Sequence, residues 1–457
     1  MSCGKMNPEK VKKVTDFMSS TIERPKYLNL LIASKNNGFP KVITGVRRCG
    51  KSFLLKNIYH DYLISSGVKK SNIVAIDLDD DKNADLRDPI ELGSHVRSLC
   101  SSQETYYVFL DEIQLVFTIV NPILTGGKHI LAKGSDKEVV SFVDTILGLS
   151  KEKSIDLYVT GSNSKMLSKD IVTEFRDKAT DIPLAPLSFE EFYGYRGGSK
   201  NDAIYDYMQY GGMPLAVLKE EQEKRKYLVD LFSTTYFKDI LDHNHLRRTE
   251  SLDELCNILS ESVGSLVNSK KIADTYHSVR KEKMDEETVN RYLAYFEDSF
   301  LLREARRFDL KGRKEIGALR KYYFVDTGLR NARLNFAFPD EGNLLENLVY
   351  NELIYHDFTV NVGCFDTIEK DEKGASARQS YEIDFYAVKN LKKYYIQVSL
   401  DLDSAKTKAR ETRPFKLLKD SIQRIIVVNK PIDETIDENG VITIGAADFF
   451  LRFLNKD

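Results

Sequence analysis

The most informative stretch of this sequence is a glycine-bounded loop that ends in a lysine and a serine, Gly45 to Ser52. An apolar strand precedes it and an amphipathic run follows it, which is the setting in which G-x-x-x-x-G-K-[ST] binds nucleotide phosphates. The two glycines let backbone N–H groups turn inward around a phosphate, and the dipole of the following helix favours negative charge there. We therefore expect an ATP or GTP site. Its expected binding residues are Gly45, Val46, Arg47, Arg48, Cys49, Gly50, Lys51, Ser52 and Phe53.

Three side chains of this loop have more specific expected roles. Lys51 would reach the β- and γ-phosphates, and Ser52 has the hydroxyl that the pattern uses as a Mg²⁺ ligand, because Mg²⁺ takes hard oxygen donors. A surface turn with a solvated lysine is the simpler alternative, and the apolar strand before the loop argues against it. Cys49 is either a small filler of the loop or a thiol whose modification blocks nucleotide binding.

Two adjacent carboxylates, Asp111 and Glu112, follow the apolar run 106–110. At the end of a buried parallel strand, the first carboxylate can hold magnesium through water, and the second can orient or deprotonate the attacking water. Asp111 is therefore the expected metal ligand, and Glu112 is the expected general base. An ordinary strand end with exposed acids is the alternative, and the phosphate loop upstream makes it the weaker one.

Two further polar residues are candidates for catalysis. Strand 155–160 ends in the polar turn 161–164, which a doubly wound sheet would place beside the γ-phosphate. Asn163 or Ser162 would then sense or position the water, although Ser and Asn are also the preferred caps of an ordinary helix start. Arg176 would stabilise the charge of a transferring phosphoryl group, and a surface arginine in an ion pair is an equal alternative.

These residues need a particular order of elements around them. Strands and helices alternate through about residue 186, which is typical of a parallel sheet built from β–α–β units. Helical periodicity dominates from 188 to 246, and short helices follow from residue 251. The stretch 116–140 contains three glycines and a proline. The sequence does not choose there between a hairpin and a mobile flap near the nucleotide.

Length and composition fit a soluble enzyme with several domains. At roughly 150 residues per domain, 457 residues suggest about three units. The apolar fraction of 42% and the charged fraction of 30% are ordinary for globular protein. No apolar stretch is long enough to cross a bilayer, and the amino terminus does not resemble a secretory signal, so we expect a cytoplasmic protein that does not span a membrane. The five cysteines have no C-x-x-C spacing, so neither a disulfide framework nor a zinc site is expected.

The formal net charge of -2 argues against a surface that attracts nucleic acid as a whole. Contact with DNA would have to be local. The densest basic tracts are 303–321 and 389–393. A solvated charged face is the default explanation for both tracts.

The ordered motifs resemble those of prokaryotic AAA-type ATPases that join a nucleotide-binding domain, a winged-helix module and a restriction-endonuclease-like carboxy-terminal domain. The resemblance covers nearly the whole chain. Besides the loop, the carboxylate pair and the turn 161–164, its marks are the segments 186–192, 210–214, 292–298, 323–330 and 383–385.

This resemblance implies an α/β fold class and a division into three units. The implied units are a P-loop AAA-type parallel-sheet domain at 1–187, a helical lid and winged helix at 188–335, and a nuclease-like α/β domain at 336–457. The resemblance also implies that the nucleotide is ATP, that the reaction is its hydrolysis, and that Mg²⁺ is required.

The nuclease-like fold implies a second metal site. In that fold an acidic helix residue, a strand aspartate and a following [E/Q]-x-Lys hold Mg²⁺ and activate water. The residues that match the first three positions are Glu346, Asp384 and Gln397. Ser399 stands at the lysine position, so we expect metal binding at most and no robust cleavage. A neighbouring lysine, Lys406 or Lys408, is a candidate to fill the gap.

Two functions follow, and both use the nucleotide site. In the first, an ATP-hydrolysing protein couples its nucleotide state to DNA engagement through the distal domains. In the second, it is an ATP-gated switch that binds another protein and no DNA, which the acidic start of the recognition-like helix at 285–287 permits. Assembly into a homo-oligomer stays open, because an arginine that acts from a neighbouring copy is not visible in one chain.

Overall fold

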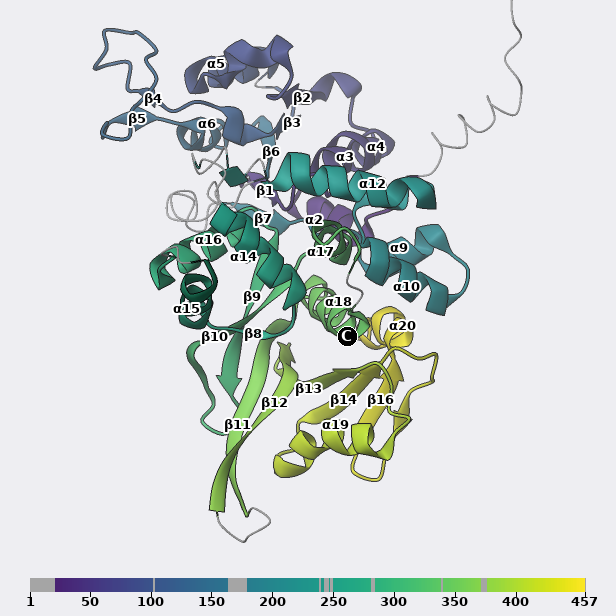
Figure 1. Ribbon diagram of the computed structural model, residues 1–457. Helices are drawn as coiled ribbons and strands as arrows, with labels where there is room; N and C mark the ends of the chain where they lie inside the picture. Colours follow the sequence, from purple (N-terminus) through teal and green to yellow (C-terminus); the bar gives the residue numbers. More distant parts are fainter. Residues whose placement is uncertain are drawn as a thin grey trace, which may run out of the picture.

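The computed structural model arranges the chain around two main β-sheets, one N-terminal and one C-terminal, with helices packed between them (Figure 1). It describes residues 21–101, 103–162, 179–237, 240–241, 246, 250–280, 284–337, 340–370 and 376–456. Within these ranges, no helix combines the length and the apolar character that a membrane span needs.

The N-terminal sheet has five strands, all parallel to their neighbours. They are β1 (Lys41–Thr44), β2 (Ile73–Asp77), β3 (Tyr106–Asp111), β6 (Ile155–Gly161) and β7 (Thr180–Pro183). Their order across the sheet is β2-β3-β6-β1-β7. Every residue of β1 and β6 is buried, which is typical of a parallel sheet covered by helices on both faces. The predicted α/β class with a parallel P-loop sheet is confirmed.

Helices pack against this sheet, and two of them begin at side-chain caps. They are α2 (Pro25–Ser34), α3 (Lys51–Phe53), α4 (His60–Ser65), α5 (Pro89–Leu99) and α6 (Phe142–Leu149). A π-helical turn, Leu54–Tyr59, joins α3 to α4. Asp88 caps α5 by accepting from two backbone N–H groups, and Ser141 forms a capping box with Asp144 at the start of α6. The stretch that the sequence left open forms a hairpin of β4 (Ile119–Val120) and β5 (Val139–Val140).

Helices dominate the middle of the chain. The first group is α9 (Phe189–Arg196), α10 (Lys200–Tyr210), α11 (Pro214–Val217) and α12 (Glu221–Leu231), followed by a π-helical turn, Phe232–Phe237. The second group is α14 (Glu250–Glu261), α15 (Ser269–Arg280), α16 (Glu286–Asp298) and α17 (Thr327–Arg333). The break between α10 and α11 needs glycine, because a Cβ atom at Gly212 would lie 2.3 Å from the backbone oxygen of Leu187. This close approach packs the first group against the end of the parallel sheet.

The C-terminal sheet has nine strands. They are β8 (Leu266–Val267), β9 (Leu302–Asp309), β10 (Lys314–Phe324), β11 (Thr359–Lys370), β12 (Ser376–Lys389), β13 (Lys392–Ser399), β14 (Gln423–Val428), β15 (Thr435–Ile436) and β16 (Val441–Gly445). The helices that accompany it are α18 (Glu341–Tyr355), α19 (Ala405–Leu417) and α20 (Ala446–Asp448), the last of which continues as a π-helical turn, Phe449–Phe453. Because β9 pairs with β11, the sheet extends across the domain boundary predicted at 335/336, which stays a prediction.

One hydrophobic cluster connects the two sheets. It includes Ile43 of the N-terminal sheet, Phe189 of α9, Leu353 of α18 and Ile425 of the C-terminal sheet, all at most 1% exposed. Figure 1 shows α18 in the middle of the molecule, between the helices of the upper part and the C-terminal sheet. The position of α18 therefore allows it to contact both halves.

Candidate functional site

The phosphate loop joins β1 to α3 at the carboxyl end of the parallel strands. Gly45 and Gly50 have φ angles of 141° and 103°, in the left-handed region that favours glycine. A Cβ atom at Gly45 would lie 2.1 Å from the backbone oxygen of Leu184, so no larger residue fits there. The two glycines therefore fix the path of the loop.

Lys51 folds back onto this loop from the first turn of α3. Its Nζ donates to the backbone oxygens of Gly45 at 2.9 Å and Val46 at 3.2 Å, and the residue is only 4% exposed. The ammonium group thus lies within the loop that would surround the phosphates.

Cys49 is fully buried inside the same loop. Its Sγ lies 3.5 Å from the backbone oxygen of Leu184, and burial raises the pKa of the thiol. A thiol that is buried and protonated reacts slowly. The structure therefore favours the small-filler interpretation of Cys49 over the reactive-thiol interpretation.

Hydrogen-bond donors surround the carboxylate of Asp111 at the end of β3. Its Oδ2 accepts from Nζ of Lys56 at 2.6 Å, its Oδ1 accepts from the Thr160 hydroxyl, and Ser52 also bonds to it. Burial raises the pKa of Asp111, but these hydrogen bonds outweigh burial and hold it below its usual range. An ionised carboxylate therefore lies next to the Ser52 hydroxyl, and both are the hard oxygen donors that Mg²⁺ prefers.

Lys56 is a site residue that the sequence interpretation missed. It also forms an ion pair with Asp77 at the end of β2, so the ends of two strands converge on one ammonium group. Burial lowers the pKa of Lys56, and its bonds to Asp111 and Asp77 raise it by more. The signal in the sequence is its spacing, because residues four apart on a helix share a face and Lys56 follows Ser52 by four positions.

Glu112 is held at the pocket by its backbone and by its side chain. Its φ angle is 54°, and its N–H donates to Oγ1 of Thr160 at 3.0 Å. Its Oε2 accepts from the Ser162 hydroxyl at 3.1 Å and from the Gln114 side chain. The sequence interpretation offered Ser162 only as an alternative to Asn163 and missed Gln114, although Gln114 lies two positions after Glu112.

A cavity of about 380 Å³ lies over the phosphate loop. Among its lining residues are Arg47, Arg48, Gly50, Lys51, Ser52, Phe53, Asp79 and Glu112. A second, largely apolar part of its wall comes from Ile22, Leu187, Pro214, Leu215 and Leu218. The segment 210–214 was recognised in the sequence as a family mark without a role, and the fold brings it to the pocket. A cavity with a polar end and an apolar end suits a nucleotide, whose phosphates are charged and whose base is flat and largely apolar.

The predicted C-terminal metal ligands surround a lysine from another part of the chain. Nζ of Lys321, on β10, lies 2.9 Å from Oε1 of Glu346, 2.8 Å from Oε1 of Glu382 and 4.0 Å from Oδ1 of Asp384. The Lys321 side chain is 3% exposed, and burial, which would lower its pKa, is outweighed by the three carboxylates, which raise it. Lys406 and Lys408 are instead exposed on α19.

The chain also covers this acidic cluster. Tyr323 donates to Glu346 at 2.6 Å, and a Cβ atom at Gly264 would lie 3.1 to 3.2 Å from the Glu346 carboxylate. Oδ2 of Asp384 accepts from the backbone N–H of Val398 at 2.8 Å. Among the described residues, no three His, Cys, Asp or Glu side chains are placed to hold a metal ion. With the ammonium of Lys321 between its carboxylates, the donor set does not fit a divalent cation in this arrangement.

The structure brings some predicted site residues together and separates others. The loop, Asp111 and Glu112 meet at one edge of the N-terminal sheet, whereas Glu346 and Asp384 belong to the C-terminal cluster. Gln397 is next to that cluster and accepts from the backbone N–H of Asp384 at 3.4 Å. The other two predicted catalytic residues, Asn163 and Arg176, lie outside the described residues.

Comparisons with known proteins agree with the N-terminal geometry. Residues 37–193 match the family model of an AAA domain, and residues 201–340 match a domain of unknown function, DUF8612. The first match contains the parallel sheet, the phosphate loop and the carboxylate pair. This part of the chain therefore resembles an AAA domain in sequence and has a P-loop parallel sheet.

Two relatives match most of the chain. An uncharacterised protein of Haemophilus influenzae is 30% identical over 437 residues, which cover 94% of this chain and 99% of that protein. An uncharacterised protein of Methanocaldococcus jannaschii is 27% identical over 394 residues, which cover 83% of this chain and 79% of that protein. The chain therefore belongs to the family of the Haemophilus influenzae protein.

Similar solved structures have low sequence identity. The Walker-type ATPase PABY2304 of Pyrococcus abyssi is 12% identical with a TM-score of 0.45, covering 69% of this chain and 96% of that one. The ORC2 protein of Aeropyrum pernix is 12% identical with a TM-score of 0.35, covering 72% of this chain and 91% of that one.

Proposed function

We propose that the protein binds ATP together with Mg²⁺ at the phosphate loop and hydrolyses its γ-phosphate. The observation that carries this proposal is the cavity over the loop, because it joins Lys51, Ser52 and Glu112 to an apolar wall. Phosphoryl transfer depends mainly on positioning and charge stabilisation, and these residues supply both. Lys51 would bind the β- and γ-phosphates from its place inside the loop.

Ser52 and Asp111 would hold the magnesium ion. Their oxygen atoms are adjacent, and the lowered pKa of Asp111 keeps its carboxylate ionised. Bound there, the ion would neutralise charge on the phosphates during transfer. Lys56 stabilises the Asp111 carboxylate from the side of the sheet at 2.6 Å.

Glu112 is the proposed general base. Its carboxylate lines the cavity and is held by Ser162 and Gln114, so its orientation is fixed before the substrate binds. Asn163 as a sensor of the γ-phosphate and Arg176 as a charge-stabilising residue belong to the same proposal and follow from the sequence alone.

Glu112→Gln tests this assignment, because glutamine keeps the size and the acceptor oxygen but does not take up a proton. We expect kcat for ATP to fall roughly 10²- to 10³-fold while ATP affinity is retained. The matched control is Glu138→Gln, at an exposed glutamate of the same domain. Undiminished turnover in Glu112→Gln would overturn the assignment.

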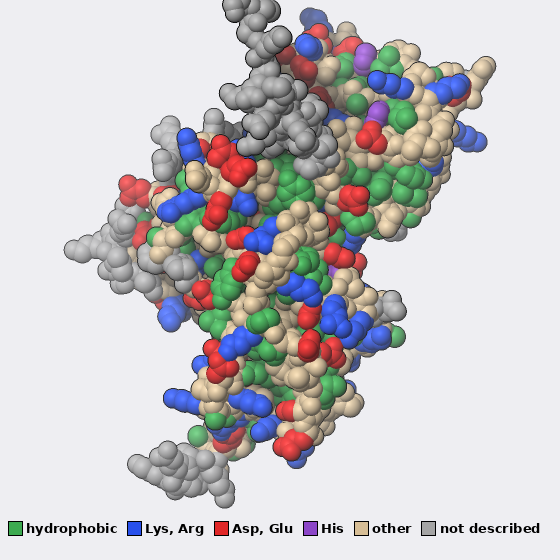
Figure 2. All heavy atoms as spheres, turned by 90° about the vertical axis from the view of Figure 1, so that its right-hand side faces the viewer, with side chains coloured by type: hydrophobic (Ala, Val, Ile, Leu, Met, Phe, Trp, Pro, Cys, Tyr) green, Lys and Arg blue, Asp and Glu red, His purple; other side chains and the backbone are tan. Residues whose placement is uncertain are grey.

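We also propose that nucleotide state controls DNA engagement by the C-terminal half. The order α14, β8, α15, α16, β9, β10 is the order of elements typical of a winged helix, which supports this. The basic tract on β9 and β10 is largely paired, since Arg306 and Arg320 bond to Glu304 and Lys321 lies in the acidic cluster. Figure 2 likewise shows Lys and Arg side chains mixed with Asp and Glu over the lower part of one face.

Helix α19 is the stronger candidate for contact with DNA phosphates. Its exposed basic residues, with one just beyond its end, are Lys406, Lys408, Arg410, Arg413, Lys416 and Lys419. Arg410 pairs with Glu411 and Arg413 pairs with Glu369, so the lysines carry most of the uncompensated charge. This helix also borders a surface cavity of about 600 Å³ that reaches Glu382 and Gln397.

A charge-reversal pair tests the DNA proposal. Lys406→Glu with Lys408→Glu should weaken binding of duplex DNA and flatten its dependence on salt, because two fewer phosphate contacts release fewer counterions. The control is Lys151→Glu with Lys153→Glu, two exposed lysines of the ATPase domain. If the protein does not bind duplex DNA and DNA does not change its ATPase rate, the function is instead that of an ATP-gated switch for a protein partner.

The proposal includes no nuclease activity at the acidic cluster. The cluster already contains the ammonium group of Lys321, and the turn at Gly264 packs against Glu346, so we expect neither Mg²⁺ nor a phosphodiester to bind between its carboxylates. Magnesium-dependent cutting of DNA by the purified protein, abolished by Asp384→Ala, would contradict this.

A further inference from the structure

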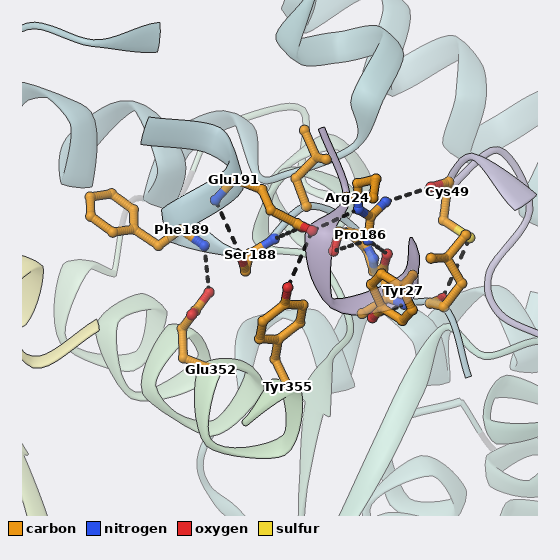
Figure 3. A network of polar contacts seen from close by, with 12 residues as sticks. Arg24, Tyr27, Cys49, Pro186, Ser188, Phe189, Glu191, Glu352 and Tyr355 are labelled. Atoms are coloured by element: carbon orange, nitrogen blue, oxygen red, sulfur yellow. Dashed lines mark hydrogen bonds and ion pairs between the residues drawn. The ribbon is translucent and has the colours of Figure 1, made fainter. Parts of the chain in front are cut away.

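Arg24 connects the phosphate loop to a buried glutamate. Its Nη1 donates to the backbone oxygen of Cys49 at 3.3 Å, and its Nε donates to Oε1 of Glu191 at 3.0 Å (Figure 3). Its Nη2 donates to the backbone oxygen of Ala185 at 2.8 Å, and the residue is 5% exposed. Arg24 is therefore fixed by several bonds beside the nucleotide cavity, which it also lines.

The contact with Cys49 has a consequence for the peptide that follows. A trans peptide is planar, and its C=O and N–H groups point in opposite directions. Because Arg24 holds the C=O of Cys49, the N–H of Gly50 is directed away from Arg24. Gly50 is one of the residues that line the cavity, and its N–H belongs to the set that loops of this pattern use to bind phosphate. Arg24 thus fixes the orientation of a phosphate-binding group.

Glu191 is shared between Arg24 and the C-terminal half of the chain. Its Oε2 accepts from the backbone N–H of Ser188 at 2.9 Å, as part of the capping box of α9. Its Oε1 accepts from Arg24 and also from the hydroxyl of Tyr355 at 3.2 Å. Figure 3 shows the three donors converging on Glu191, with Tyr355 projecting from α18.

A second contact joins α18 to the start of α9. The carboxyl group of Glu352 accepts from the backbone N–H of Phe189 at 2.7 Å and from the Tyr207 hydroxyl at 3.2 Å, and the residue is 1% exposed. Nearer its N-terminus, α18 carries Glu346, which Lys321 holds in the C-terminal cluster. One helix therefore contacts the nucleotide-binding half at its end and the C-terminal cluster nearer its start.

We propose that Glu191 and Tyr355 are positioning residues for the phosphate loop, so that docking of α18 and binding of ATP are coupled. Tyr355 helps to fix Glu191, Glu191 fixes Arg24, and Arg24 orients the peptide between Cys49 and Gly50. This inference rests on the proposed binding of ATP. Linkage requires it to be reciprocal: if the docked helix strengthens ATP binding, ATP must strengthen docking of the helix by the same factor.

Tyr355→Phe in the full chain tests the proposal, because it removes one hydroxyl and keeps the ring. Calorimetric titration with ATP should show an affinity about 2- to 10-fold weaker than in the unaltered protein, the effect of one lost hydrogen bond. The matched control is Tyr350→Phe on the same helix, which removes a hydroxyl that donates to the backbone oxygen of Glu304 at 3.0 Å. That control should leave ATP affinity unchanged.

Two further measurements separate positioning from general destabilisation. Combining Tyr355→Phe with Glu191→Gln should weaken ATP binding no more than Glu191→Gln alone, because both changes break the same connection. Hydrogen exchange of residues 344–355 should slow when ATP is added to the unaltered protein, and it should slow less in Tyr355→Phe. If Tyr355→Phe does not fold, Glu191→Gln alone should still weaken ATP binding and reduce this protection.

The outcomes distinguish the inference from the function on which it rests. If the unaltered protein does not bind ATP, the proposed function fails. If it binds ATP and Tyr355→Phe matches Tyr350→Phe in both affinity and exchange, the coupling is overturned while the ATP site stands.

Discussion

Two of the buried lysines, Lys51 and Lys321, have surroundings that differ in one decisive respect. Lys51 is 4% exposed and donates to two backbone oxygens of the phosphate loop, which carry no formal charge. Lys321 is 3% exposed and lies among three carboxylates. The charge of Lys51 is therefore available to an anionic ligand, whereas the charge of Lys321 is already balanced by the protein. Burial and positive charge alone therefore do not make a phosphate site.

The two regions also differ in whether a surface cavity reaches the buried lysine. The cavity of about 380 Å³ over the phosphate loop includes Lys51, Ser52 and Glu112 in its wall. The surface cavity of about 600 Å³ beside α19 reaches Glu382 but does not include Lys321 in its lining. We therefore expect the first region to bind ligand and the second to hold elements of the fold together.

The largest expected effect comes from removing the charge of Lys321. Lys321→Met keeps the length of the side chain but leaves buried carboxylates without a cation, which should lower the free energy of unfolding by about 3 to 5 kcal/mol. Denaturant unfolding of the full chain measures this. Lys314→Met, at an exposed lysine of the same strand, is the control. Unchanged stability in Lys321→Met would show that the ammonium group of Lys321 does not hold the C-terminal cluster together.

Lys51→Met should show the opposite pattern. Turnover of ATP should fall roughly 10²- to 10³-fold, because one preorganised donor to the phosphates is lost, while stability changes little. A steady-state ATPase assay at saturating Mg²⁺ measures this. Our expectation would be wrong if Lys321→Met lowered the ATP turnover of the folded protein as much as Lys51→Met does.

Glu352, between the two regions, gives stability a dependence on pH. Burial is the main reason that its pKa is raised from 4.5 to about 8, and the negative charges of Glu190 and Glu191 also raise it. The N–H of Phe189 and the hydroxyl of Tyr207 act in the opposite direction. The folded protein thus keeps a proton that the unfolded chain releases above about pH 4.5. The contribution of Glu352 to the free energy of unfolding should therefore fall as pH rises from about 4.5 to 8.

Glu352→Gln is uncharged at every pH and should remove most of that fall. His356, on the next turn, should act in the opposite direction between about pH 4 and 6.5, because burial lowers its pKa from 6.5 to about 4 and only the unfolded chain binds the proton there. Unfolding at a series of pH values compares Glu352→Gln with Glu341→Gln, an exposed glutamate at the start of the same helix. Parallel pH profiles for the two variants would show that Glu352 does not carry the dependence.

The smallest expected effect concerns the divalent ion itself. Asp111→Asn should weaken Mn²⁺ binding to the ATP complex about 10-fold, because an oxygen donor of full negative charge is lost. Asp384→Asn should leave that affinity unchanged. Electron paramagnetic resonance of free Mn²⁺ measures both without any assay of turnover. Loss of a second Mn²⁺ site in Asp384→Asn would mean that the C-terminal cluster does bind metal.

Local spacing was sufficient to predict the N-terminal half. The run Gly45 to Ser52 and the pair Asp111 and Glu112 each lie in one short segment, and alternation of strands and helices predicts the parallel sheet that brings them to one edge. Lys56 and Gln114 were within reach of the same reasoning, because each lies within four residues of a recognised site residue.

Contacts between distant segments were not predictable in this way. Lys321 comes to the C-terminal cluster from β10, and Pro214 comes to the nucleotide cavity from a segment after the parallel sheet. Arg24 reaches the loop from the chain before β1. No local period or spacing relates these residues to their partners, because tertiary packing alone brings them together.

Calorimetric titration of the full chain with ATP in the presence of Mg²⁺ tests the central claim most directly. We predict saturable binding to a single class of site, lost in Lys51→Met and retained in Lys321→Met. Absence of ATP binding by the folded, unaltered protein, or equal loss of binding in both variants, would contradict it.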